Sequence, residues 1–274
     1  MNSEKTPSPL DNEKTKEYFS KIAEKEGVNK ASNVDKFEEI KSLLLPHDEH
    51  ISILECGGGG GFYTNQLLNI GYRVTCVDLS HEALVVNLNN AKKIGKENKL
   101  KTVESDFVDF CKSNKEKFDQ VVFIKVLHHF SSLKDIEYAL LGAVEHCQKG
   151  SRVVIFEPNG TNPFWRFFLS FQKGMSGRSK WFYEQNMKFT TVKNLSNILD
   201  IIKLASNRKI RYKIGYHYVI PAMITKKHKR HSLLDKINNL LESSWLKKWF
   251  SFNISIIIRE WFDIGCSYRS IRQG

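Results

Sequence analysis

Apolar residues follow two different periods along this chain. Between residues 51 and 156, short apolar runs rich in Val, Ile and Phe are separated by longer segments in which apolar residues recur every three or four positions. The short runs are typical of buried strands, and the longer period is typical of amphipathic helices. The pattern predicts strands at 51–55, 73–77, 101–104, 120–125 and 151–156, and helices at 62–70, 81–94, 107–114 and 132–147.

The regular alternation of these elements favours an α/β fold with a parallel sheet and helices on both faces. Right-handed crossovers then bring the loops that follow the strands to one edge of the sheet. Before this region, residues 13–45 carry the spacing of amphipathic helices, which Pro46 ends. After it, we expect a helix at 192–204, a strand at 209–219, amphipathic helices within 232–250 and a seventh strand at 252–259.

Length and pattern together divide the chain into four parts. A chain of 274 residues can bury a full core, and it suits one elaborated domain better than two independent ones. We expect a disordered tail at 1–12, a helical lid at 13–46, a ligand-binding α/β core at 47–159, and a substrate-side part with a basic C-terminal region at 160–274.

The cysteines and the N-terminus bear on the compartment. The five cysteines form no C-x-x-C pair and are odd in number, which favours buried thiols in a reducing environment over disulfides or a zinc site. The first residues are polar and lack the apolar segment of a signal peptide. No stretch reaches the roughly 18 apolar residues that a membrane-spanning helix needs. We therefore expect a cytoplasmic protein without a metal site.

Basic charge is concentrated near the C-terminal end. The formal net charge is +12, yet residues 1–159 contain 21 Lys/Arg and 24 Asp/Glu, whereas residues 203–274 contain 15 and 4. Three interpretations stay open for that basic region: a solvated face above core, a surface for anionic membrane or a lipid-like substrate, and a nucleic-acid surface. A solvated face is the most common use, and the mixture of Trp with Lys fits a membrane better than nucleic acid.

The densest chemical signal follows the first predicted strand. It places an acid and then glycines at alternate positions, as Glu55-x-Gly57-x-Gly59-x-Gly61. Glycine lets backbone approach a ligand closely, and the following helix directs its N-terminal N–H groups to the same place. A dinucleotide-binding turn needs a third glycine at residue 62 or 63, and those positions hold Phe and Tyr. A flexible linker is the alternative interpretation of such a run.

Polar and aromatic residues also follow the later strands. Asp78 ends the second predicted strand, where a carboxylate can accept both hydroxyls of a ribose. Asp106 and Phe107 follow the third strand. The fourth strand leads into a pair of histidines, and the fifth ends at the run Glu157-Pro-Asn159.

In this order, the segments between about residues 50 and 160 resemble the class I S-adenosylmethionine-dependent methyltransferases, in particular the small-molecule, type 11-like group. The resemblance implies a Rossmann-like three-layer sandwich with a seven-stranded, mostly parallel sheet and an antiparallel last strand. It implies S-adenosylmethionine as the cofactor. The implied contacts are Glu55 at the amino group, the loop at Gly57, Gly59 and Gly61, Asp78 with Leu79 at the ribose, Asp106 and Phe107 at the adenine, and Tyr18 in an N-terminal lid.

The catalytic residues are less clearly marked. Methyl transfer from a sulfonium needs alignment and, where the nucleophile carries a proton, a base. His128 and His129 are the candidates, because the ordinary pKa of histidine lies near 6.5; a structural histidine is the alternative. Lys125, which ends the fourth strand, would contact the cofactor or an anionic substrate group. The alternative for Lys125 is a pairing with Asp119 or Glu157.

These observations predict a methyltransferase that acts on an oxygen, or on a carbon, of a small-molecule or lipid-like acceptor. Two other functions remain open. One is an RNA methyltransferase that uses the basic C-terminal face, and the other is a partner protein that binds the cofactor without catalysis.

Overall fold

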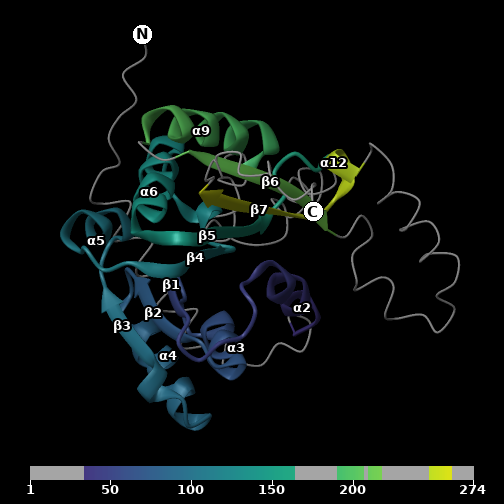
Figure 1. Cartoon of the computed structure of the whole chain (residues 1–274). Helices are drawn as coiled ribbons and strands as arrows, with labels where there is room; N and C mark the ends of the chain where they lie inside the picture. Colours follow the sequence, from purple (N-terminus) through teal and green to yellow (C-terminus); the bar gives the residue numbers. More distant parts are fainter. Residues whose placement is uncertain (1–33, 164–189, 207–208, 218–246, 261–274) are drawn as a thin grey trace, which may run out of the picture.

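A computed structural model describes residues 34–163, 190–206, 209–217 and 247–260. Within them the chain forms one mixed sheet, whose strands lie in the order β3-β2-β1-β4-β5-β7-β6 (Figure 1). The strands are β1 (Ser52–Cys56), β2 (Arg73–Asp78), β3 (Leu100–Glu104), β4 (Phe118–Ile124), β5 (Cys147–Pro158), β6 (Ile210–His217) and β7 (Asn253–Glu260). The predicted tail and the lid residue Tyr18 lie outside the described residues, as do residues 232–246 of the amphipathic helices predicted within 232–250.

Helices cover both faces of this sheet. One face carries α2 (Val34–Leu43), α3 (Phe62–Ile70) and α4 (His81–Lys93), and the other carries α5 (Phe107–Ser113), α6 (Leu133–His146) and α9 (Val192–Ala205). The short turns η2 (Glu97–Lys99), η3 (Leu127–His129) and α12 (Lys247–Phe250) lie in the connections. The predicted alternation and the three-layer α/β fold are thereby confirmed.

Each face of the sheet has its own hydrophobic core. In β1, Ile53 packs with the core on the α2–α4 side, whereas its neighbour Leu54 packs with the core on the α5–α9 side. Both side chains are fully buried. A parallel strand buried on both faces gives a continuous apolar run. This is why the central strands show no alternation of apolar and polar residues in the sequence.

The last strand in the chain lies inside the sheet. β7 pairs antiparallel with β5 on one side and with β6 on the other, as the resemblance implied. β5 itself begins four residues earlier than predicted, because α6 already ends at His146 and Cys147 pairs with Phe118 of β4. The register between these strands then shifts around Gly150, which has a φ of 83°. Residues 147–150 therefore form an irregular strand start, which the apolar pattern did not reveal.

Side-chain caps begin several helices close to the end of the preceding strand. Ser80 Oγ accepts the Ala83 N–H of α4 at 3.1 Å, and Ser132 Oγ accepts the Asp135 N–H of α6 at 3.1 Å. Such caps satisfy N–H groups that have no partner in the first helical turn. The chain enters α4 three residues after the end of β2, whereas α6 begins nine residues after the end of β4. Both connections lie along the carboxyl edge of the parallel strands.

A polar contact joins α2 to β6, the last strand in the sheet order. His217 Nδ1 lies 2.9 Å from Glu39 Oε2, and His217 Nε2 lies 2.7 Å from Ser255 Oγ on β7. Gly215 leaves room for this arrangement, because a Cβ at that position would lie 2.5 Å from Ser255 Oγ. The N-terminal helix is thus attached to residues that come almost 180 positions later (residue 39 to residue 217).

Asn159 holds the loop that follows β5. Its side-chain NH2 group lies 3.1 Å from the Lys248 carbonyl oxygen, and 3.0 Å from both the carbonyl oxygen and Oγ of Ser251. Its Oδ1 accepts the Thr161 N–H at 3.0 Å. The side chain is fully buried. Asn159 therefore joins the end of β5, where Glu157 lies, to the turn that precedes β7.

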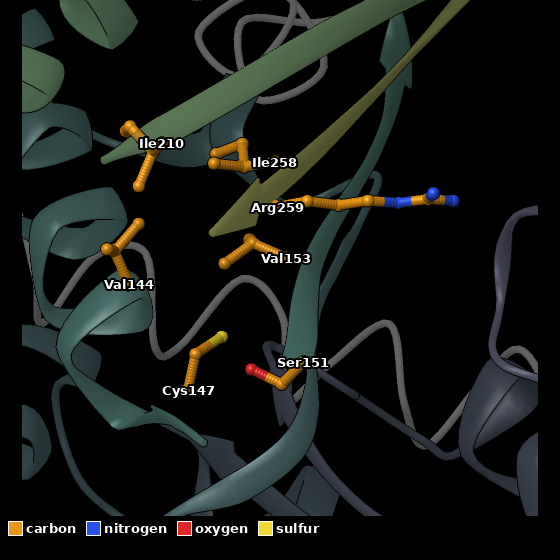
Figure 2. Close-up of a pocket in the computed structure, with 7 residues that line it drawn as sticks. All are labelled: Val144, Cys147, Ser151, Val153, Ile210, Ile258 and Arg259. Atoms are coloured by element: carbon orange, nitrogen blue, oxygen red, sulfur yellow. The ribbon is translucent and has the colours of Figure 1, made fainter. Parts of the chain in front are cut away.

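A small cavity lies where β5 and β6 begin and β7 ends (Figure 2). Cys147 and Ser151 of β5, Ile210 of β6 and Ile258 of β7 are among the residues that line it. Its volume of about 10 Å³ has room for one water molecule at most. It is too small for a substrate, and it lies away from the edge that carries the predicted site residues.

Four of the five cysteines lie in the described residues and are free and buried, as the sequence predicted: Cys56, Cys76, Cys111 and Cys147. Cys266 lies outside the described ranges. Among the helices that the structure describes, none combines the length and apolar character needed to cross a bilayer.

Replacing Asn159 with Asp tests how much this side chain stabilises the fold. Aspartate keeps the size and the acceptor for Thr161, but it has no N–H to donate to the carbonyl groups of Lys248 and Ser251. We expect the free energy of unfolding to fall by roughly 1–3 kcal/mol, as measured by urea unfolding. Asn69→Asp on the exposed face of α3 is the control and should change it by less than about 0.5 kcal/mol. Similar small losses in both variants would contradict the assignment.

Candidate active site

The glycine loop between β1 and α3 has a regular backbone. Gly57, Gly59 and Gly61 have φ values of 69°, 51° and 89°, so that every second residue takes the left-handed conformation. Side chains strongly disfavour this region of φ, which explains why the motif has glycine at alternate positions. The Gly59 N–H donates to Asp78 Oδ2 at 2.8 Å, and this bond holds the loop against the end of β2.

Most of the loop glycines make room for the protein itself. A Cβ on Gly57 would lie 2.3 Å from Val126 Cγ2, and one on Gly61 would lie 2.3 Å from Asn87 Oδ1. A Cβ on Gly59 would have no heavy atom within 4 Å. Gly59 is therefore the loop glycine with open space above it, and it marks the side on which a ligand can approach the backbone.

Glu55 lies beneath this loop. Its side chain is 2% exposed, and its Oε2 accepts the Thr64 hydroxyl at 2.6 Å, while Asn87 Nδ2 donates to the same Thr64 oxygen at 3.0 Å. Burial raises the pKa of Glu55 from 4.5 to about 7; the bond from Thr64 opposes this shift, and the charge of Asp78 adds to it. The contact between Glu55 and a cofactor amino group stays a prediction, because the observed partner of this carboxyl is Thr64.

Asp78 ends β2 and faces the glycine loop. Its two oxygens accept backbone N–H groups, Oδ2 from Gly59 and Oδ1 from Ser80 at 2.9 Å. Burial raises the pKa of this carboxyl, and the N–H donors counteract the rise. Each carboxylate oxygen can accept more than one hydrogen bond, so both keep acceptor capacity for a ligand. Leu79, next in the chain, is half-buried at the same edge.

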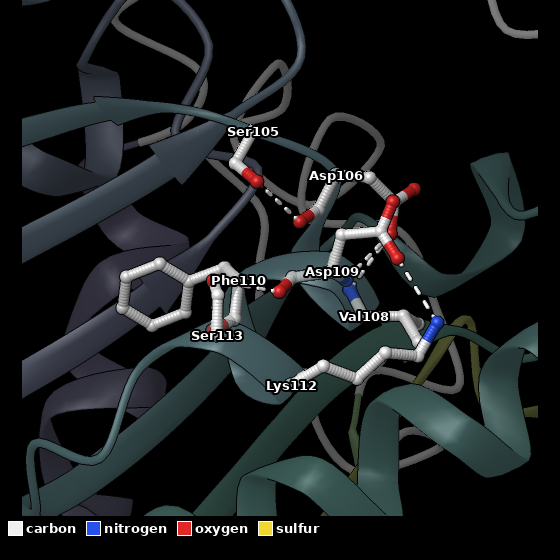
Figure 3. A network of polar contacts seen from close by, with 7 residues as sticks. All are labelled: Ser105, Asp106, Val108, Asp109, Phe110, Lys112 and Ser113. Carbon is white, nitrogen blue, oxygen red and sulfur yellow. Dashed lines mark hydrogen bonds and ion pairs between the residues drawn. The ribbon is translucent and has the colours of Figure 1, made fainter.

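Asp106 caps α5 at the end of the neighbouring strand. Its Oδ1 accepts the N–H groups of Val108 and Asp109, which Figure 3 marks with dashed lines; the distances are 2.8 and 3.3 Å. The Phe107 side chain instead points into the core, where its ring centroid lies 5.2 Å from that of Phe123. Helix capping and core packing thus account for both residues without a ligand. Their predicted contacts with adenine stay predictions.

The chain leaves β4 through an unusual conformation at Lys125. Its φ is 54°, and it is the one non-glycine residue with positive φ in the described part of the chain. This conformation costs a residue with a side chain roughly 1–2 kcal/mol. The Lys125 N–H donates to the Phe156 carbonyl oxygen at 2.8 Å. The next two N–H groups, of Val126 and Leu127, donate to Glu157 Oε1 at 2.7 and 2.8 Å.

The Lys125 ammonium lies near the start of α3. Its Nζ is 5.8 Å from the ring centroid of Tyr63, the second residue of that helix. The predicted alternative that paired Lys125 with Asp119 is wrong. Asp119 lies near the other end of β4, roughly 20 Å away at the usual rise of a strand. Its carboxylate accepts the N–H and the hydroxyl of Ser52 instead.

His128 and Glu157 form a buried pair at the same edge. His128 Nδ1 lies 2.7 Å from Glu157 Oε2, and the Glu157 side chain is fully buried. The carboxylate thus holds the Nδ1–H tautomer, which leaves Nε2 as the acceptor nitrogen. Glu157 was missed as a site residue in the sequence. The available signal was an acid at the end of the fifth strand, but its partner comes 29 residues earlier.

The two histidines have different environments. Burial lowers the pKa of His129 well below its ordinary value, and the neighbouring His128 adds to this effect. The two ring centroids are 3.9 Å apart. His129 is therefore a poor proton acceptor, and the geometry favours His128 of the two predicted catalytic residues.

A glycine loop after β1, with acids at the ends of β2 and β3 and a seven-stranded sheet with β7 antiparallel, defines the fold of class I S-adenosylmethionine-dependent methyltransferases. Residues 54–155 match a family model described as a methyltransferase domain. The described part of the chain thus has the fold of this class, and the match to the methyltransferase domain covers less than half of the chain.

Similarity to individual proteins agrees with the fold. A curated relative, the ubiquinone biosynthesis O-methyltransferase of Rickettsia canadensis (strain McKiel), is 29% identical over 134 residues, which are 47% of this chain and 53% of the relative. The match thus spans about half of that protein. A solved S-adenosylmethionine-dependent methyltransferase from Archaeoglobus fulgidus has a TM-score of 0.55 at 16% identity, covering 84% of this chain and 95% of its own.

A geranyl diphosphate C-methyltransferase from Streptomyces coelicolor A3(2) has a TM-score of 0.54 at 14% identity, covering 82% of this chain and 77% of its own. At these identities the two solved structures show a common fold and nothing finer.

The loop glycines can be tested as a pair. Gly57→Ala and Gly59→Ala both place a side chain at positive φ, which costs roughly 1–2 kcal/mol. Only the Gly57 substitution also meets Val126, so it should lose a further 1–3 kcal/mol or so of unfolding free energy. Adding Val126→Ala to Gly57→Ala should restore part of that loss. Equal losses in the two single variants would show that packing against Val126 is unimportant.

The raised pKa of Glu55 predicts a pH-dependent stability. Between pH 4.5 and about 7 the folded protein keeps a proton that the unfolded chain releases, so the stabilisation is fully present below pH 4.5 and is lost as the pH rises through 7. Relative to Glu55→Gln, the free energy of unfolding of the wild type should therefore fall by about 3 kcal/mol over that pH range. Denaturant unfolding of both proteins at several pH values measures the difference, and a constant difference would refute this prediction.

Proposed function

We propose that this protein transfers a methyl group from S-adenosylmethionine to an oxygen, or to a carbon, of a small-molecule or lipid-like acceptor by in-line displacement. When bound, the cofactor supplies a methyl group that its positively charged sulfur already activates. The residues of this chain must then bind, align and, for a protonated nucleophile, accept a proton.

The residues at the carboxyl edge fit this cofactor. Open space lies above Gly59, where backbone can approach a ligand without a Cβ in the way. Asp78 has acceptor capacity for ribose hydroxyls. Both contacts that Asp106 makes to its helix use Oδ1, which leaves Oδ2 as a possible acceptor for the adenine amine. Leu79 and the other loop glycines complete the cofactor side in this proposal.

The His128–Glu157 pair is the observation that carries the proposal of catalysis. Nε2 of His128 would take the proton from the acceptor, and the imidazolium that forms would be stabilised by the Glu157 carboxylate 2.7 Å from Nδ1. The His128 side chain is 13% exposed, so it reaches the surface of the site while its partner stays buried. A buried carboxylate that orients a partly accessible imidazole is the arrangement that a general base needs.

The name of the curated relative, an O-methyltransferase, supports an oxygen as the acceptor atom. In the chain itself, Trp249 is 49% exposed next to Lys247 and Lys248 on α12. An exposed tryptophan beside lysines is suited to an anionic membrane surface, and it supports a lipid-like acceptor and peripheral membrane binding.

Transfer of a labelled methyl group tests the function directly. The purified protein is incubated with S-adenosylmethionine labelled in the methyl group and with separate metabolite, lipid and RNA extracts of its host. Label is expected in a metabolite or a lipid. Label in RNA alone would favour an RNA methyltransferase, and cofactor binding without any transfer would favour a non-catalytic partner protein.

Glu157→Gln tests the proposed base. The amide can still accept the N–H groups of Val126 and Leu127, but its NH2 group would face His128 Nδ1 and force the other tautomer, with the proton on Nε2. We expect kcat to fall by roughly 10²–10⁴-fold with little change in cofactor affinity. His128→Gln should have a similar effect, and the exposed His50→Gln should have none. Full activity in either site variant would exclude His128 as the base.

A further inference from the structure

Lys125 has a backbone conformation that its residue type does not favour. The other residues with positive φ in the described ranges are all glycines. Glycine would adopt this conformation without strain, so it would be the less costly residue at the end of β4. Strained residues that persist in a fold are concentrated at functional sites, and this one lies beside the glycine loop. The strained backbone of Lys125 therefore indicates that the lysine side chain has a function.

The turn itself does not require a lysine. It brings the N–H groups of Val126 and Leu127 to Glu157 Oε1, and both bonds use backbone atoms alone. Gly57, on the loop opposite, packs directly against Val126. A glycine at 125 would allow the same bonds and the same packing. What lysine adds is a positive charge at the boundary between the glycine loop and β4.

Two polar groups meet at this boundary. The Lys125 ammonium lies over the face of Tyr63, at 5.8 Å from the ring centroid, which is within the range of a cation–π contact. The Tyr63 hydroxyl is buried and has no hydrogen-bond partner in the described part of the chain. A buried hydroxyl without a partner is costly, and a ligand that accepts a hydrogen bond there would remove that cost.

The order of the strands indicates which part of a ligand reaches these groups. Asp106 follows β3, Asp78 ends β2, the glycine loop follows β1 and Lys125 follows β4, and these four strands are neighbours in the sheet. A nucleoside whose base and ribose lie at Asp106 and Asp78 has its 5′ side over the loop and β4. In S-adenosylmethionine, the 5′ side carries the amino-acid group with its carboxylate.

We propose that Lys125 is the counter-ion of the cofactor's carboxylate, with the Tyr63 hydroxyl as a second donor to that group. This role rests on the proposed function, because it requires that S-adenosylmethionine binds at this site. It also gives a reason for the strained backbone of Lys125. The fold accepts a less stable backbone at residue 125 in order to place a cation where the anionic end of the methyl donor lies.

The test compares two ligands that differ in one group. Calorimetry measures the affinity for S-adenosylmethionine and for decarboxylated S-adenosylmethionine, which keeps the adenosine, the sulfonium and the amine. The wild type should prefer the carboxylated ligand by about tenfold or more. Lys125→Gly and Lys125→Met should bring this ratio close to one, mainly because they weaken the binding of the carboxylated ligand. Lys125→Arg should keep most of the preference, and Tyr63→Phe should reduce it by a few-fold.

Thermal unfolding without ligand separates charge from strain. Lys125→Gly removes both, so its midpoint should equal or exceed that of the wild type, whereas Lys125→Met keeps the strain and should not gain stability. A preference for the carboxylated ligand that survives in Lys125→Gly would overturn the proposal, as would equal affinities in the wild type. If the wild type bound neither ligand, the proposed function itself would fail. These outcomes are therefore distinguishable.

Discussion

One buried carboxylate organises the edge of the sheet on which the site depends. Glu157 ends β5 and accepts bonds from three consecutive residues after β4, the N–H groups of Val126 and Leu127 and the ring of His128. An isolated charge at a fully buried position would be very costly, and these three donors offset that cost. Since the donors are consecutive, the same carboxylate fixes both the turn at Lys125 and the orientation of the histidine.

The glycines of the loop are needed for packing within the protein as well as for the approach of a ligand. Gly57 and Gly61 lie against Val126 and Asn87, whereas Gly59 has open space where its side chain would be. The acid of the motif is likewise turned inward, to Thr64. Contacts within the protein therefore hold the loop in this conformation, so its N–H groups are in place before a ligand binds. Preorganisation of this kind lowers the cost of ordering a site on binding.

Much of the fold could be predicted because it depends on local pattern. The apolar runs located β1 to β4 and β7 to within a few residues, and the order of the motifs placed Asp78, Asp106 and His128 at one edge. The irregular start of β5 was missed, because it depends on a register shift against Phe118 rather than on its own residues.

The site was harder to predict than the fold. The His128–Glu157 pair joins residues 29 positions apart, and Phe107 turned out to be core because Phe123 lies opposite it. The sequence also gave no sign of the strain at Lys125. Contacts of this kind depend on how the strands pair and how the helices pack, which a single sequence does not state.

The contact between Glu39 and His217 links α2 to β6, two elements that lie far apart in the sequence. An N-terminal segment grafted from a relative would bring its own residue to position 39. Without a carboxylate there, the imidazole that Ser255 and Gly215 accommodate would lose its partner on α2. A chimera that keeps this contact would therefore have to take α2 and β6 from the same parent, or restore the pair by design.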